Sequence, residues 1–356
     1  MTTTTAVDEE RLGRVLGQAV TDMGAALNGV LVMIGDELGL WRALAGAGPL
    51  TSGALARRSA VAERYVREWC ATQAASGYLD YDATNDTFAL SPEHAMAFAD
   101  ENSPVYMLGG YHVISSAYKD RQRISRRIRD GQGFGWHEHD PELFTGTEQF
   151  FRPGYRAHLL TDWIPALDGV EQKLRTGAKV ADIGCGHGVS TILMARAYPQ
   201  STFCGFDAHR ASIDRARQLA EREGATSNTR FEVATAKDVP DDGYDLVCFF
   251  DCLHDLGDPV GALRQVRNAL APDGTVLLVE PFAGDRLADN LNPVGRIYYA
   301  ASTLVCTPCS LAQDVGLALG AQAGQQRLQH VAQQAGFTRF RRATETAFNL
   351  ILEARP

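Results

Sequence analysis

The chain has 356 residues, of which 45% are hydrophobic and 22% are charged. These values are ordinary for a globular protein, so they exclude wholesale disorder and low-complexity scaffolds. At about 150 residues per domain, the length predicts two domains. The formal net charge of −9 argues against a nucleic-acid partner, because phosphate binding needs a cationic surface.

No apolar run in the sequence approaches the ~20 residues of a membrane-spanning helix. The first ten residues, MTTTTAVDEE, are polar and then acidic, whereas a secretion signal has a basic segment followed by an apolar one. We therefore expect a cytoplasmic protein with no membrane partner. The seven cysteines are scattered, which disfavours a disulfide framework.

The first 103 residues predict a helical, winged-helix domain. Apolar residues recur at steps of three or four along residues 8–45, which predicts a long helix with an apolar stripe. Either a partner subunit or the rest of the same domain covers this stripe.

Residues 49–91 then follow the order helix, turn, helix, hairpin. Thr51 is suited to cap the first helix, a second helix is expected over residues 62–76, and the segments YLDYD and TFALS alternate as hairpin strands do. This winged-helix pattern serves either DNA recognition or dimerisation. We favour dimerisation, because the arginines of the second helix are balanced by glutamates.

Residues 104–175 are expected to form a mostly helical bridge that lines a substrate site. Two histidines precede Asp140 in this bridge and suggest a metal, but a polar pocket lining is favoured because alternate residues of an extended segment point apart. Residues of the bridge and of a later insertion are candidates for the walls of the substrate site: Trp136, His137, Phe150, Tyr155 and Tyr298.

Residues 176–356 alternate short apolar runs with helical stretches, which predicts an α/β domain with a parallel sheet. The chain ends in a helix and two adjacent strands, which suggest an antiparallel hairpin at the sheet edge. The insertion 283–324 is too long for an idle connection and suggests a lid over the substrate. Cys306 and Cys309 within it have the spacing of a redox pair, but we favour a plain loop over a redox or metal site.

The strongest signal is the run VADIGCGHG, residues 180–188, at the end of the first predicted strand of this domain. Glycines there let the backbone turn tightly and approach a ligand. Asp207 ends the next strand, at a spacing close to the roughly 20 residues of dinucleotide folds, and a carboxylate there accepts ribose hydroxyls.

The glycine run departs from a dinucleotide fingerprint, because Val189 stands where a third glycine or alanine is wanted. Asp182 precedes the loop, and a carboxylate would repel a pyrophosphate but suits an ammonium and a sulfonium. The pattern therefore favours S-adenosylmethionine over a nicotinamide dinucleotide.

Residues 179–282 and the closing helix and strands resemble a class I S-adenosylmethionine-dependent methyltransferase. The N-terminal region resembles that of bacterial and plant small-molecule O-methyltransferases, and the whole is similar to actinobacterial proteins of this type. The resemblance implies a Rossmann-like seven-stranded sheet, a homodimer formed through the N-terminal domain and a small-molecule acceptor.

The same resemblance implies which residues contact the cofactor. Asp207 would hold the ribose, with Ala208 beside the adenine, and Thr235 stands where the family commonly has an acid. The remaining implied cofactor contacts are Asp182, Gly184, Gly186, Ala236, Lys237, Phe250 and Asp251.

The run His254-Asp-Leu-Gly-Asp258 matches three of the five positions of a His-Asp-Trp-Ser-Asp run in plant-type O-methyltransferases. In those enzymes the histidine is the general base that takes the proton of a phenol, and imidazole is suited to this at neutral pH. Leu256 replaces the tryptophan, and many methyltransferases carry a histidine there without using a base. A metal-dependent variant using Asp251, Asp289 and Asn290 is less favoured, because Asp289 lies beyond the fifth strand.

These features predict a methyltransferase that acts on a small, hydroxylated acceptor by in-line displacement, without a metal and with His254 as the base. Three alternatives stay open. They are a winged-helix DNA-binding regulator, a thiol or metalloid methyltransferase that uses Cys306 or Cys309, and a cofactor-binding protein without turnover.

Overall fold

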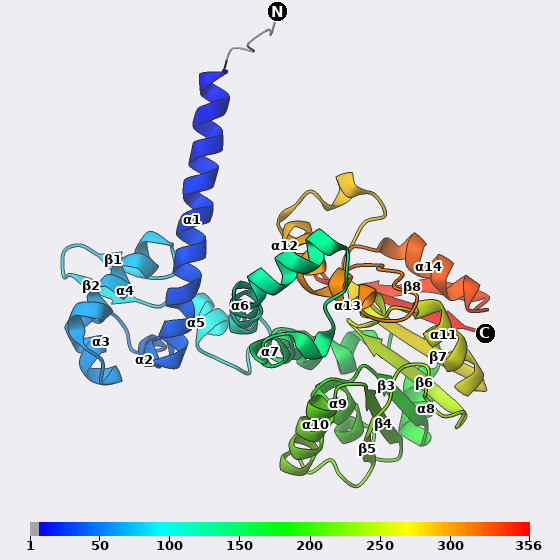
Figure 1. Cartoon of the computed structure of the whole chain (residues 1–356). Coiled ribbons are helices and arrows are strands. Elements are labelled where there is room, and N and C mark those ends of the chain that lie inside the picture. Colours follow the sequence, from blue (N-terminus) through cyan, green and yellow to red (C-terminus); the bar gives the residue numbers. More distant parts are fainter. Residues whose placement is uncertain (1–6) are drawn as a thin grey trace, which may run out of the picture. The chain divides into compact units, whose positions relative to one another are not determined.

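The computed structural model describes residues 7–356, and the chain divides into two compact units, Met1–Ser115 and Ser116–Pro356 (Figure 1). The first unit is mostly helical and carries one small hairpin. Its elements are α1 (Glu9–Glu37), α2 (Leu40–Leu44), α3 (Ser52–Ser59), α4 (Glu63–Ala75), β1 (Asp80–Asp82), β2 (Thr87–Ala89) and α5 (Pro92–Phe98). Helix α6 (Leu108–Asp130) continues into the second unit.

The winged-helix prediction for the first unit is confirmed. The Thr51 hydroxyl accepts a hydrogen bond from the backbone N–H of Ala54 at 3.2 Å and caps α3, and β1 pairs antiparallel with β2. The predicted helix over residues 8–45 is broken, because Gly39 adopts a left-handed conformation (φ 68°) between α1 and α2. The core of this unit contains Trp41, whose ring centroid lies 4.7 Å from that of Trp69.

Helix α1 is buried only near its C-terminal end, at Asn28, Val32 and Gly35. It contains an 18-residue window of mean hydropathy 1.3, of which 11% is buried, so by length and composition alone it is apolar enough to cross a membrane. The expectation that no segment reaches this length was wrong, because alanines and glycines extend the apolar run between the larger side chains. Core helices and signal sequences pass the same test, so the window alone does not indicate a membrane.

The second unit contains the sheet and its helices. The helical elements are η1 (Trp136–Glu138), α7 (Glu142–His158), η2 (Leu159–Trp163), α8 (Val170–Thr176), α9 (Val189–Ala197), α10 (Arg210–Arg222), η3 (Leu253–Asp255), α11 (Pro259–Ala269), η4 (Leu287–Asn290), α12 (Pro293–Ala301), η5 (Ser302–Cys306), α13 (Thr307–Leu311) and α14 (Gly324–Gln334). The strands are β3 (Lys179–Ile183), β4 (Thr202–Asp207), β5 (Thr229–Val233), β6 (Tyr244–Phe250), β7 (Leu270–Pro281), β8 (Arg339–Glu345) and β9 (Asn349–Arg355).

The sheet has seven strands in the order β5-β4-β3-β6-β7-β9-β8, so the Rossmann-like prediction is confirmed. The first five are parallel, whereas β9 pairs antiparallel with β7 and with β8. The predicted terminal hairpin therefore forms, with β9 inside the sheet and β8 at its edge.

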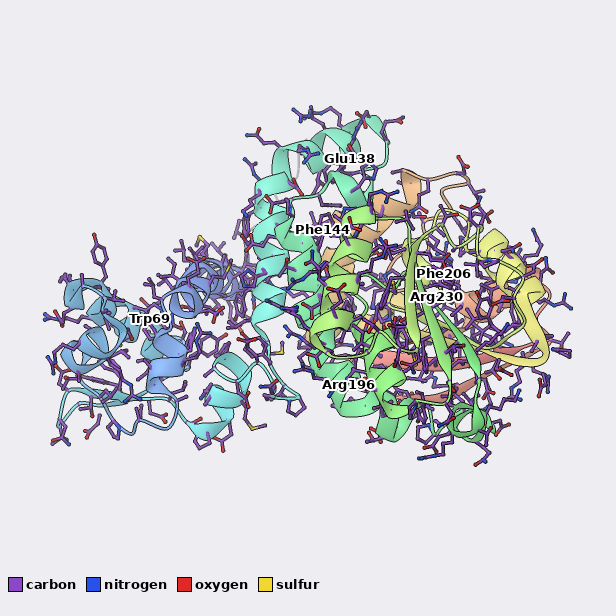
Figure 2. The ribbon with its side chains drawn as sticks, turned by 90° about the horizontal axis from the view of Figure 1, so that it is seen from below. Trp69, Glu138, Phe144, Arg196, Phe206 and Arg230 are labelled. Atoms are coloured by element: carbon purple, nitrogen blue, oxygen red, sulfur yellow. The ribbon has the colours of Figure 1, made fainter. Side chains whose placement is uncertain are left out.

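Helices cover both faces of this sheet. Alternate strand residues separate into two cores, because neighbouring side chains of a strand point to opposite faces. One core joins Phe206 and Phe249 to α11 and α14, and the other joins Phe203 and Leu246 to α8 and α9. Phe206 is 1% exposed and lies among the strands in Figure 2.

The insertion 283–324 is largely helical. Cys306 ends η5 and Cys309 lies in α13, and both thiols are buried. The expectation of a plain loop at this pair was wrong, because η5 and α13 follow α12 without a break.

Candidate functional site

The candidate site lies at the carboxyl ends of the parallel strands β3, β4, β6 and β7. This is the edge at which open α/β sheets bind ligands. Residues from the glycine loop, from the ends of β4, β6 and β7 and from α7 contribute side chains there.

The glycine loop after β3 requires glycine at two positions. Gly184 and Gly188 have φ angles of 68° and 77°, and a Cβ added to them would lie 2.7 Å from Cys252 Sγ and 2.6 Å from the Phe231 ring. Gly186 also has a positive φ of 52°, but a Cβ there would meet no atom within 4 Å. The loop therefore packs tightly on two sides and stays open at Gly186, as a ligand cradle does.

Asp207 ties this loop to the end of β4. Its carboxylate accepts hydrogen bonds from the backbone N–H of Gly186 at 2.9 Å and of His209 at 2.7 Å. Burial raises the pKa of Asp207, and the two backbone N–H groups oppose that shift. Side chain and loop are thus held in a fixed relation before any ligand binds.

Asp182 lies beneath the loop and is 1% exposed. Its Oδ2 accepts hydrogen bonds from Ser190 Oγ at 2.7 Å and from Thr191 Oγ1 at 2.6 Å. Its Oδ1 is buried and has no hydrogen-bond partner among the described residues. Burial raises the pKa of this carboxyl to about 6, so a cationic or hydrogen-bonding ligand would satisfy an oxygen that the protein leaves unpaired.

The residues expected near adenine differ in exposure. Ala208 and Thr235 are exposed, and the Thr235 hydroxyl donates to Asp238 at 2.5 Å. Ala236 is buried in the core, and the Lys237 side chain lies 3.5 Å from Asp258. Ala208, Thr235 and Lys237 are thus exposed at this end of the site, whereas Ala236 belongs to the core.

An aromatic row that the sequence did not predict lies beside Asp207 and Ala208. The Phe144 ring lies 4.6 Å from the His209 ring and 5.3 Å from the Trp136 ring, between centroids. Figure 2 shows Phe144 on α7. Through Phe144 the row links Trp136 to His209, which follows β4, whereas His137 is exposed. The buried histidine of this segment is His139, which contacts Asp120 at 3.2 Å.

A second group of aromatic residues gathers at the end of β6. Tyr155 packs against Phe250 with centroids 5.4 Å apart, and its hydroxyl donates to Asp251 at 3.3 Å. Asn349 donates to the other oxygen of Asp251 at 2.8 Å. Asp251 adopts a left-handed φ of 51°, a strained conformation for a residue other than glycine, which these contacts hold in place.

Phe150 and Tyr298 lie near this group. Phe150 packs edge to face on Phe151, whose ring stacks on Tyr155 at 6.1 Å. The Tyr298 hydroxyl donates to the carbonyl of Phe348 at 2.9 Å, beside Asn349. Four of the five predicted substrate residues thus belong to the two aromatic groups or adjoin them, and His137 does not.

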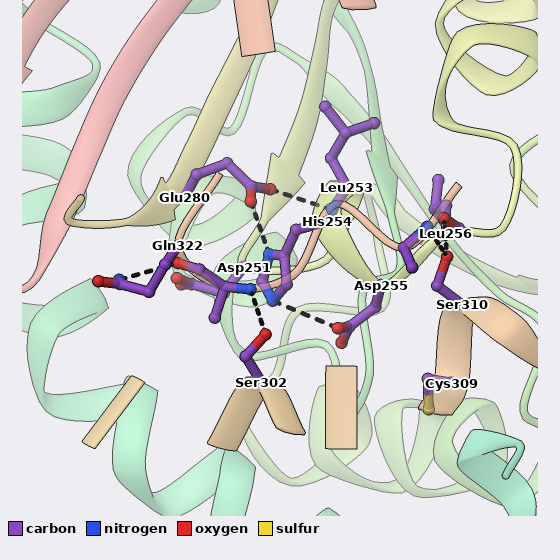
Figure 3. Close-up of polar contacts among 12 residues, drawn as sticks. Asp251, Leu253, His254, Asp255, Leu256, Glu280, Ser302, Cys309, Ser310 and Gln322 are labelled. Atoms are coloured by element: carbon purple, nitrogen blue, oxygen red, sulfur yellow. Dashed lines mark hydrogen bonds and ion pairs between the residues drawn. The ribbon is translucent and has the colours of Figure 1, made fainter. Parts of the chain in front are cut away.

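His254 lies in η3 between two carboxylates (Figure 3). Its Nδ1 is 2.6 Å from Glu280 Oε2 and its Nε2 is 3.3 Å from Asp255 Oδ1. The other oxygen of Glu280 accepts the backbone N–H of Leu253 at 3.0 Å. Burial by itself lowers the pKa of His254, but the charges of Asp255 and Glu280 outweigh it and raise that pKa well above the ordinary value.

Glu280 was not among the residues predicted from the sequence. It is 1% exposed at the end of β7, in the run TVLLVEP. An acidic residue in an otherwise apolar buried strand needs a partner, and this signal was present in the sequence.

Comparison with known proteins agrees with this geometry. Residues 174–336 match the family model of a methyltransferase domain, and residues 25–99 match an Rv2258c-like winged HTH domain. The chain thus carries a methyltransferase domain that follows a winged helix-turn-helix domain.

Curated relatives match about a third of the chain. The 27-O-demethylrifamycin SV methyltransferase of Amycolatopsis mediterranei is 31% identical over 139 residues, which cover 37% of this chain and 51% of the relative. The tRNA 5-carboxymethoxyuridine methyltransferase of Escherichia coli is 35% identical over 111 residues, which cover 30% and 40%. The chain thus spans about half the length of these relatives, and they act on different kinds of acceptor.

Solved structures match nearly the whole chain in fold. Human N-acetylserotonin methyltransferase, solved with S-adenosylmethionine, has a TM-score of 0.67 at 18% identity, with 99% of both chains covered. The mitomycin 7-O-methyltransferase has a TM-score of 0.68 at 20% identity, with 98% of this chain and 100% of the other covered. An O-methyltransferase family protein of Burkholderia thailandensis has a TM-score of 0.69 at 16% identity, with 99% of both covered. At these identities the likeness shows the fold.

Proposed function

We propose that this methyltransferase transfers a methyl group from S-adenosylmethionine to a hydroxyl group of a small, largely apolar molecule. The observation that carries the proposal is the glycine cradle with two fixed carboxylates, one of which keeps an unpaired buried oxygen. The name of the structural relative solved with S-adenosylmethionine supports the choice of cofactor.

In this proposal the two carboxylates bind opposite ends of the cofactor. Asp207, at the end of β4, accepts the ribose hydroxyls, and Ala208 and Thr235 border the adenine. Asp182 Oδ1 receives the ammonium end, directly or through water, with Gly184 and Gly186 giving the backbone close access. Phe250 and Asp251 border the methionine portion at the end of β6.

The bound cofactor supplies an electrophilic methyl group on a sulfonium. The protein's part is to hold the acceptor oxygen in line with that methyl and to exclude water. The rings of Trp136, Phe150, Tyr155 and Tyr298 form the apolar walls that do so. A hydroxylated aromatic acceptor suits such walls, because offset and edge-to-face ring contacts are favourable.

His254 is the proposed general base for the acceptor hydroxyl. Glu280 holds the Nδ1–H, which leaves the lone pair on Nε2 to take the proton. Asp255 Oδ1 lies 3.3 Å from Nε2 and favours the protonated ring, so His254 acts as a base only once Nε2 has lost its proton. Glu280 is a positioning residue that fixes the tautomer.

We further propose a homodimer formed through α1. Large apolar side chains stay exposed along one side of this helix at alternating steps of three and four residues: Leu16, Val20, Met23, Leu27 and Val30. That spacing is typical of a helix that packs on a second helix. A cytoplasmic location stays a prediction.

DNA binding is the less favoured role for the winged helix. The arginines of α4 are paired with glutamates on the same helix, Arg64 with Glu68 and Arg67 with Glu63. A recognition helix needs free basic side chains for phosphates and base edges.

A turnover assay tests the proposed function. Full-length protein is incubated with methyl-labelled S-adenosylmethionine and a panel of phenols, matched thiols and matched amines, and products are read by mass spectrometry. We expect methyl ethers from phenols, lost in Asp207→Ala. Transfer to thiols alone would contradict the hydroxyl assignment.

A further inference from the structure

A buried cluster beside the proposed base brings together three kinds of metal-binding side chain. His254, Asp255 and Cys306 each offer one ligand atom, and these atoms lie within 4.8 Å of one another. His254 and Asp255 belong to η3 after β6, whereas Cys306 comes from η5 in the insertion. Cys306 is 6% exposed and His254 is 4% exposed.

The histidine is oriented as a metal ligand. Nδ1 points to Glu280 Oε2 at 2.6 Å, and a metal-bound histidine typically donates its other ring N–H to a carboxylate in this way. Nε2 faces Asp255 Oδ1 at 3.3 Å, a separation of the size found between two ligands bound to one ion at about 2 Å. Figure 3 shows the ring between the two carboxylates.

The cluster sets two carboxylates against a single imidazole, which supplies at most one positive charge. The carboxylates of Glu280 and Asp255 both face one imidazole ring, and Glu280 is 1% exposed. Asp255 Oδ1 is buried and accepts no hydrogen bond from the described residues, although it lies at ion-pair distance from the ring. Buried carboxylates are costly without a partner, and a dication would neutralise this pair.

We propose that His254 Nε2, Asp255 Oδ1 and Cys306 Sγ bind a divalent transition-metal ion of the zinc class. Nitrogen and thiolate ligands select zinc and similar ions over magnesium or calcium. The thiol of Cys306 gives up its proton on binding, and Glu280 fixes the histidine from outside the ligand set. Three protein ligands leave one position of a tetrahedral ion open.

Metal binding has a consequence for the proposed function, and this part rests on His254 being the base. An ion on Nε2 occupies the lone pair that would take the acceptor's proton. The metal-loaded protein is therefore inhibited in methyl transfer to hydroxyls. The metal site itself does not depend on the reaction, so the two are tested separately.

The test measures Zn2+ binding to metal-free full-length protein by competition with a chromogenic chelator. We expect one ion per chain, with affinity weakened at least about 100-fold in Cys306→Ser and about 10- to 100-fold in Glu280→Gln. Cys309→Ser is the matched control, because this thiol is also buried in the same helical stretch but lies outside the cluster. It should bind as the unmodified protein does.

Cobalt substitution gives a second, spectroscopic measurement. Co2+ bound to a thiolate shows a sulfur-to-metal charge-transfer band, which we expect in the unmodified protein and in Cys309→Ser. Absence of this band, or equal Zn2+ affinity in Cys306→Ser and Cys309→Ser, overturns the site. Zn2+ binding at the cluster with unchanged turnover would keep the site but contradict His254 as the base.

Discussion

Single residues at the carboxyl edge of the sheet are held in place by bonds within the protein. Asp207 is fixed by two backbone N–H groups, and Asp182 is fixed through one of its oxygens by two hydroxyls. Such prior fixing lowers the cost of ordering the site when a ligand binds. The chemistry of the site therefore depends on which oxygens remain available.

Asp182 should make cofactor affinity depend on pH. Burial raises the pKa of this carboxyl to about 6, so it is protonated below that pH and loses its attraction for a cationic end of the cofactor. We expect the affinity for S-adenosylmethionine to fall as pH drops from 7 through about 6, by up to tenfold per pH unit. Calorimetry over this range is the measurement, and Asp182→Asn should bind more weakly and lose the dependence. An unchanged slope in the variant would remove Asp182 from the binding site.

The carboxylates around His254 should set the pH profile of turnover. Their charges raise the pKa of His254 well above its ordinary value, so the free base forms only at a higher pH than for an ordinary histidine. We expect kcat to rise with pH along an alkaline limb, and Asp255→Asn to move this limb to lower pH because it removes one negative charge. A profile that does not move in Asp255→Asn would contradict the electrostatic argument.

His254→Gln tests the base itself. Loss of a general base costs about 10²–10⁴-fold in rate, so kcat should fall by at least about 100-fold with cofactor affinity unchanged. The measurement is turnover together with cofactor titration of the same preparation. Turnover within about threefold of the unmodified protein would show that positioning alone suffices.

At the scale of elements, the C-terminal cap of α3 can be tested by substitution. Helix α3 ends at Ala60, which adopts a left-handed conformation (φ 55°, ψ 40°) that favours glycine. We expect Ala60→Gly to stabilise the protein by about 0.5–1 kcal/mol. The matched control is Ala71→Gly in the middle of α4, which should destabilise by about 1 kcal/mol. Urea unfolding of the full chain measures both, and equal signs would refute the cap argument.

Elements with local signals could be predicted from the sequence. The alternation in β1 and β2, the cap at Thr51 and the glycine loop after β3 depend on neighbouring residues, and the structure has all of them. The helix break at Gly39 and the helical stretch at Cys306 were missed. The helix break depends on a single residue, Gly39. The helical stretch at Cys306 continues from α12 in a region whose sequence has no strong helical periodicity.

Site residues from distant segments could not be predicted in the same way. Asp207 and His254 were found because they sit in motifs at strand ends. The Glu280–His254 contact joins the end of β7 to η3, and the Phe144–His209 contact joins α7 to the start of α10. No pattern of neighbouring residues predicts such contacts, because they depend on the order of the strands in the sheet and on where the helices pack.

At the scale of the whole molecule, we base the proposed dimer on the exposed apolar side chains along α1. Leu27 is 73% exposed and Val20 is 64% exposed, which is unusual for large apolar side chains in a row. We expect Leu27→Glu to shift the full-length protein from dimer to monomer, because a charge in such a contact loses its hydration.

The oligomeric state is measured by light scattering coupled to size exclusion. Ala25→Glu is the control, since it adds the same charge on the opposite side of α1, where Ala25 is also exposed. The control should stay dimeric. A monomeric unmodified protein, or a Leu27→Glu variant that stays dimeric, would contradict the assignment of this face.

The proposed function depends above all on S-adenosylmethionine binding by the loop after β3 and the carboxylate at the end of β4. Its most direct test is a calorimetric titration of the full-length protein with this compound at pH 7.5, beside Asp207→Ala. We expect one binding site per chain, with affinity at least about tenfold weaker in the variant because the ribose hydroxyls lose their acceptor. Absence of binding to the unmodified protein, or equal affinity in both proteins, would contradict it.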